Sequence, residues 1–76
     1  MDLSPYKGQR ILVVFTEKAA KSNMLEQITG SLTHHPNDNG EIRLLSSHPK
    51  GAKISIIPQE EIAQIYYNET IIYQTS

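Results

Sequence analysis

The stretch QITGSLTHHPNDNGEIRLLSS, residues 27–47, decides the fold that this sequence predicts. At its centre, residues 36–40 are five consecutive turn-forming residues, Pro-Asn-Asp-Asn-Gly. The pair Asn39-Gly40 readily adopts the positive φ angles of a tight hairpin turn, and proline removes a backbone donor from any strand that contains it. We therefore expect two strands that pair on either side of residues 36–40.

The residues flanking this turn alternate as antiparallel strands do. Ile28, Gly30 and Leu32 fall on one face of residues 27–34, and Ile42 and Leu44 alternate with other residues in 41–47. A period of two places the apolar set on one face of a strand and the polar set on the other. Both segments are therefore predicted to be half-buried strands.

Four further segments predict short β-rich elements on either side of this hairpin. The third of them is expected to begin as a helical turn after Pro58 and to continue as a strand through Ile65, because proline ends a central strand. The segments are residues 10–16, 53–57, 59–67 and 69–74.

In residues 53–57, Ile54 and Ile56 alternate with Lys53 and Ser55. This alternation predicts that the two isoleucines share one face of the strand and that Lys53 and Ser55 share the other.

Residues 16–30 permit two interpretations. Their apolar residues recur at helical spacing, Thr16 can act as an N-cap, and Gly30 stands where a C-terminal glycine would. Against a helix, Ser22 and Asn23 are weak helix formers, and Gly30 also completes the alternating face of the next strand. We favour a loop or a single turn at residues 18–23, followed by a strand.

Short strands at intervals of about ten residues, joined by polar turns, predict an all-β fold. The expected architecture is a small, strongly bent antiparallel barrel of five to six strands, with room for one short helix or helical turn. The alternative is an α+β fold with a helix at about residues 17–29. Residues 1–8 are expected to form an N-terminal arm and residues 9–76 a single domain.

Length and composition exclude several classes of function. A chain of 76 residues has room for one small core, and without cysteine it offers no disulfide, thiolate metal site or thiol nucleophile. The longest apolar run, residues 11–15, is too short to cross a membrane, and the N-terminus has no secretory pattern. We expect a cytoplasmic, non-enzymatic protein with no cofactor and no membrane partner.

A second turn is predicted at residues 48–51, His-Pro-Lys-Gly, which closes another hairpin. Three histidines, His34, His35 and His48, lie in or beside the two main turns, and Asp38 is near them in the sequence. Neighbouring residues of a strand point to opposite faces, so His34 and His35 cannot both bind one metal ion within a strand. We therefore predict no metal site.

Charge is distributed unevenly along the chain. Residues 1–53 carry seven cations and five anions, a net charge of +2, whereas residues 54–76 carry three glutamates and no cation, a net charge of −3. A basic face would suit single-stranded nucleic acid, because cations neutralise its phosphates. The candidate contacts for nucleic acid are Lys7, Arg10, Lys18, Lys21, Asn37, Asn39, Arg43, Lys50 and Lys53.

The acidic C-terminal region also holds three of the four tyrosines. Tyrosine combines a large apolar ring with a polar tip, which suits it to protein interfaces. The candidate interface residues are Ile65, Tyr66, Tyr67, Ile71, Ile72 and Tyr73.

The strand pattern resembles that of the Sm-like family of small β-barrels. The resemblance covers about residues 7–67 and lies in the segments KGQRILV (7–13), GSL (30–32), IRLL (42–45), ISII (54–57) and IAQIY (62–66). It implies RNA binding through an Asp/Asn loop before the third strand, where this chain offers Asn37, Asp38 and Asn39, and ring assembly through the last strands. Where the family carries a cation between its last two strands, this chain has Pro-Gln-Glu-Glu at 58–61.

Two functions follow from these patterns. The first is a small β-barrel interaction module that self-associates or binds a protein partner through its C-terminal strands. The alternative is an Sm-like regulator that binds RNA or single-stranded nucleic acid with the cations of residues 7–53.

Overall fold

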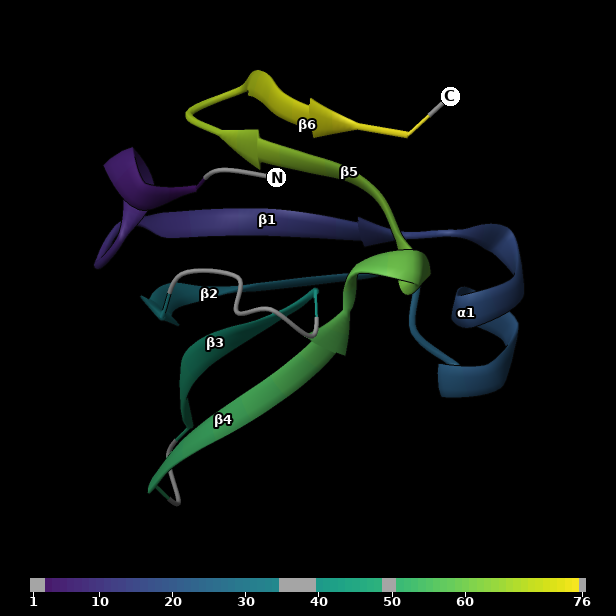
Figure 1. Ribbon diagram of the computed structural model, residues 1–76. Coiled ribbons are helices and arrows are strands. Elements are labelled where there is room, and N and C mark those ends of the chain that lie inside the picture. Colours follow the sequence, from purple (N-terminus) through teal and green to yellow (C-terminus); the bar gives the residue numbers. More distant parts are fainter. Residues whose placement is uncertain (1–2, 35–39, 49–50, 76) are drawn as a thin grey trace.

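The computed structural model describes residues 3–34, 40–48 and 51–75. Along these described residues, six strands, one α-helix and two short 3₁₀ helices follow one another (Figure 1). In order they are η1 (Ser4–Tyr6), β1 (Arg10–Phe15), α1 (Glu17–Asn23), β2 (Gln27–His34), β3 (Glu41–His48), β4 (Gly51–Pro58), η2 (Gln59–Glu61), β5 (Ile62–Tyr67) and β6 (Thr70–Gln74).

All six strands belong to one antiparallel sheet with the order β4-β3-β2-β1-β5-β6. β1 lies near the middle, between β2 and β5, and its pattern of burial alternates along the strand. The sheet is bent, so that β4 runs obliquely to β1 and β5 (Figure 1). The predicted all-β fold with a short helix is confirmed. β4 and β6 are the two edge strands of the sheet.

Residues 16–30 combine parts of both predicted alternatives. A helix forms, but it ends at Asn23 and does not reach residue 29, because Met24 adopts the left-handed conformation with φ 55°. The Oγ1 of Thr16 accepts a hydrogen bond from the backbone N–H of Ala19 at 3.2 Å, as an N-cap does. The predicted strand then begins at Gln27.

The core lies on the inner face of the bent sheet and draws residues from β1 to β5. Leu3, before η1, and Ala19 of α1 complete it, so part of the predicted N-terminal arm packs against the sheet. Among the described residues, the buried hydrophobic ones are Leu3, Ile11, Val13, Phe15, Ala19, Leu32, Ile42, Leu44, Ile57, Ile62 and Ile65.

The face of β4 that holds Ile54 and Ile56 is the outer one. Ile54 is 56% exposed and Ile56 is 55% exposed, whereas Ile57 is buried in the core. The two isoleucines do share a face as predicted, but the inner face belongs to Ile57, which pairs with the buried Ile42 of β3.

Gly30 allows β2 and β3 to approach each other closely. A Cβ atom at this position would lie 2.9 Å from the carbonyl oxygen of Leu45 and 3.1 Å from the Cβ of Leu44. The first of these atoms belongs to the backbone, so it cannot move aside as the end of a flexible side chain can. The absence of a side chain at residue 30 is therefore a packing requirement of the fold.

We predict that Gly30→Ala destabilises the protein by about 1–3 kcal/mol, because the added methyl group overpacks the contact between β2 and β3. Chemical unfolding followed by circular dichroism measures the change in free energy. Thr29→Ala, at the neighbouring exposed position, is the matched control and should have a smaller effect. Equal stability of Gly30→Ala and the parent protein would contradict this account of the bend.

Candidate protein-interaction surfaces

The six predicted interface residues of the C-terminal hairpin β5–β6 divide between the two faces of the sheet. Ile65 has no exposed surface and pairs with Val13, so it belongs to the core and is not accessible to a partner. Tyr67, Ile72 and Tyr73 are partly buried and pack against the core.

Two of these tyrosines also hold the hairpin in place. The ring of Tyr67 lies against that of Tyr6, with 5.2 Å between the ring centroids, and its hydroxyl donates to Oε1 of Gln9 at 3.4 Å. The hydroxyl of Tyr73 accepts a hydrogen bond from Nε2 of Gln59 at 3.3 Å. Tyr67 and Tyr73 therefore link β5 and β6 to the N-terminal segment and to η2.

Tyr66 and Ile71 are the members of the set that lie on the outer face. They are cross-strand partners in the ladder between β5 and β6. Ile71 is 45% exposed, and Tyr66 is half-buried beside Leu12 of β1, with which it also pairs. This pair is the part of the predicted interface that lies on the outer face of the sheet.

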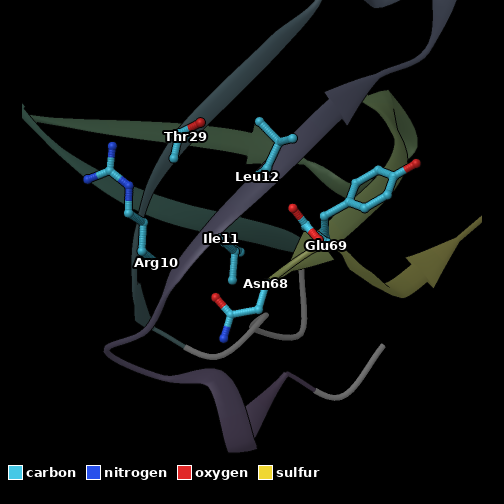
Figure 2. Close-up of a pocket in the computed structure, with 7 residues that line it drawn as sticks. Arg10, Ile11, Leu12, Thr29, Asn68 and Glu69 are labelled. Carbon is cyan, nitrogen blue, oxygen red and sulfur yellow. The ribbon is translucent and has the colours of Figure 1, made fainter.

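An open depression of about 430 Å³ lies on the outer face next to this pair. Leu12 and Tyr66 contribute apolar surface, and residues of the hairpin turn form part of the rim. Figure 2 shows Arg10 and Thr29 on one side of Leu12 and Glu69 on the other. The depression therefore has an apolar floor with one cation and one anion at its margin.

The turn between β5 and β6 places two consecutive non-glycine residues in the left-handed conformation. Tyr67 and Thr70 are paired, and the two residues between them both have positive φ angles, 48° at Asn68 and 70° at Glu69. Two-residue hairpin turns of this kind favour Asn-Gly, because glycine has no Cβ to clash in the left-handed region. Glutamate at the second position therefore carries a conformational cost.

The cations predicted to contact nucleic acid do not form one basic face within the described part of the chain. Lys18 and Lys21 lie on α1, beyond one end of β1, and Arg10 lies at the other end of that strand. Lys53 lies on the far side of the sheet order, in β4.

Two of these cations are next to carboxylates. Nζ of Lys21 lies 3.6 Å from Oε1 of Glu17, and Nη2 of Arg43 lies 3.8 Å from Oε1 of Glu41. Lys7 is exposed after η1. The remaining predicted contacts, Asn37, Asn39 and Lys50, are outside the described residues.

Sites for metal or for catalysis were not predicted, and the described residues hold no group of three or more His, Cys, Asp or Glu side chains that could bind a metal ion. His35 and Asp38, which the sequence places near the first turn, are outside those residues. Within the same part of the chain, no helix is long and apolar enough to cross a membrane.

A second exposed apolar surface was not predicted. It lies on the outer face of the hairpin β3–β4 and consists of Leu45, Ile54 and Ile56, which are 36%, 56% and 55% exposed. Leu45 pairs with Ile54, and Ile56 is next along the same face. A signal for this surface was present in the sequence, because residues 54, 56 and 57 are all isoleucine and only one of the two faces of a strand can enter the core.

Comparisons with known proteins find no matching protein family, no matching curated protein and no matching solved structure.

We predict that Glu69→Gly stabilises the protein by about 0.5–1 kcal/mol, because glycine adopts a φ of 70° without the steric cost of a Cβ. The thermal midpoint and the free energy of unfolding measure the gain. Asn68→Gly is the matched control and should change stability less, since asparagine tolerates the left-handed conformation better than glutamate does. A loss of stability in Glu69→Gly would show that the carboxylate stabilises the turn by more than its backbone costs.

Proposed function

We propose that this chain is a non-enzymatic interaction module that self-associates or binds a protein partner through its C-terminal hairpin β5–β6. The observation that carries the proposal is the outer-face pair Tyr66 and Ile71, which stands beside the depression over Leu12. An exposed isoleucine next to a half-buried tyrosine offers apolar area together with a polar tip, a combination that is enriched in protein interfaces.

The Sm-like resemblance supports the same function. The five segments that carry it, from 7–13 to 62–66, overlap the first five strands of the structure. The resemblance implies assembly through pairing of the last strands with a neighbour. In this chain β6 already pairs with β5, so the edge available to such a neighbour is that of β6.

The nucleic-acid alternative has one supporting feature, the presence of Arg10 and Tyr66 around the same depression. Proteins that bind single strands combine cations along the backbone with aromatic rings on which bases stack. Glu69 lies at the rim of this depression, however, and the other described cations lie apart from it. Protein binding therefore accounts better for the surface.

A photo-crosslinking residue at position 71 tests the protein interaction. We expect it to give a crosslinked product in the producing cell, either of twice the mass of the chain or with one defined second protein. The same residue in place of Lys18, exposed on α1, is the matched control and should give no such product. Equal crosslinking at the two positions would overturn the proposal.

For the alternative, we expect no salt-sensitive binding of fluorescently labelled single-stranded RNA to the purified protein at low or moderate salt. Affinity supplied by phosphate contacts falls steeply as the salt concentration rises. Tight binding at low salt that weakens with salt, and that Arg10→Gln reduces, would favour nucleic acid over protein as the ligand.

A further inference from the structure

The edge strand β4 has eight residues, and each of them pairs with a residue of β3 without a register shift. Its other side has no partner strand among the described residues, since β4 ends the order of the sheet. The opposite edge strand, β6, has five residues and pairs with β5 across a register shift. A long, regular edge strand is a template to which another strand can add.

The direction of the unpaired backbone groups of β4 follows from its register with β3. Just beyond the strand, the N–H of Gln59 donates to the carbonyl oxygen of Gly40 at 2.6 Å. Because hydrogen-bonding direction alternates along an antiparallel strand, odd-numbered residues of β4 bond towards β3 and even-numbered ones face the open side. The N–H and C=O groups of Ile54 and Ile56 therefore point away from the sheet.

The side chains of these two residues also lie on an exposed surface. Together with Leu45 they form the outer apolar surface of the hairpin β3–β4, and all three are at least 36% exposed. The free backbone groups and the exposed apolar side chains thus belong to the same residues. An added strand would satisfy the former and cover part of the latter.

We propose that the occupant of this edge is a second copy of the chain, paired β4 to β4 in antiparallel orientation about a two-fold axis at Ser55. This inference goes beyond the proposed function of the C-terminal hairpin and does not depend on it. In this register Ile54 of each copy faces Ile56 of the other, and Leu45 extends the apolar surface on each side. Six apolar side chains would then form one continuous patch across the two copies.

The strand itself disfavours the registers with the axis at Lys53 or at Ile56. An axis at Lys53 would place the two lysines directly opposite each other, which is destabilising for like charges. An axis at Ile56 would place Ile54 opposite Pro58, which has no N–H to donate, whereas with the axis at Ser55 Pro58 faces Ala52 and both Ile54–Ile56 pairs keep their hydrogen bonds. With the axis at Ser55, the two copies of Lys53 are four residues apart along the strand direction, about 13 Å, which exceeds the screening length in physiological salt.

Charge complementarity favours the same partner. In this register Lys53 faces Ile57 of the other copy, and η2 follows there with Glu60 and Glu61. A positive end of each β4 is thereby directed towards an acidic turn of the other copy, and the two-fold axis forms this contact twice. The edge is therefore complementary to itself in backbone groups, apolar side chains and charge.

Cysteine crosslinking tests the register, because the natural chain has no cysteine. In the proposed dimer, residues 55 of the two copies form a pair with about 4.5 Å between Cα atoms, within the range that a disulfide can bridge. We expect Ser55→Cys to form a disulfide-linked dimer under mild oxidation, and Lys53→Cys, at a more exposed position, to remain monomeric. Equal oxidation of the two variants, or efficient crosslinking only when they are mixed, would overturn the proposal.

Sedimentation of the full chain without added cysteines is the second measurement. An edge contact of this size is small, so concentrations up to about 1 mM are appropriate. We expect Ile54→Thr/Ile56→Thr to weaken dimerisation by about tenfold or more while the circular dichroism spectrum stays unchanged, because threonine keeps the β-branch and loses apolar area.

Ile71→Thr is the matched control, since it makes the same change at an exposed isoleucine of the C-terminal hairpin. It should leave the β4 dimer intact, whatever its effect on association through the C-terminal hairpin. Dimerisation that is lost in Ile71→Thr and retained in the double variant would overturn the β4 dimer and support the C-terminal hairpin. A wild-type chain that remains monomeric at the highest concentration would also overturn the β4 dimer.

Discussion

The close approach of the backbone at Gly30 to β3 is the constraint on which the rest of the structure depends. A sheet of six short strands encloses a core only if it bends, and a side chain at residue 30 would meet the carbonyl oxygen of Leu45 at 2.9 Å. The bend directs Leu32, Ile42 and Leu44 towards the same interior as the buried residues of β1 and β5. With a core this small, the loss of that contact would affect every strand.

The same bend determines where apolar side chains remain outside. The β3–β4 hairpin turns obliquely to β1 (Figure 1), and of the isoleucines of β4 only Ile57 lies in the core. On the other side of β1, the outer face carries Tyr66 and Ile71. Among the described residues, the outer face of the sheet thus carries apolar surfaces on two different hairpins, and each lies beside an edge strand of the sheet.

Sequence predicted those features that are determined within one segment. The alternation of Ile42 and Leu44 was enough to place both in the core, and Pro58 was enough to end β4 before a helical turn. Which face of β4 enters the core was not predictable in this way, because isoleucines occupy both even and odd positions of the strand. Its orientation depends on the pairing of Ile57 with Ile42, a contact between segments.

The candidate site was predictable to the level of the hairpin but not of the side chain. Ile65 and Tyr66 are adjacent in sequence, and their faces are fixed by pairing with Val13 and Leu12 of β1, whose own inner face is set by the core. Composition predicts a strand here but does not show which of two such neighbours faces the core, since either residue type suits an interface. For the same reason the regular edge of β4 could be recognised only once the sheet order was known.

The two edges of the sheet have different consequences for assembly. Pairing of β4 with β6 of another copy would leave the complementary edges free, and such a head-to-tail contact continues into rings or filaments. Pairing of β4 with itself uses the longer edge of both copies and closes at two chains. The charge of Lys53 on β4 limits the registers that such pairing can adopt, as charged residues on edge strands commonly do. A self-complementary β4 edge therefore covers part of the exposed isoleucine side chains in a closed dimer and does not lead to open-ended association.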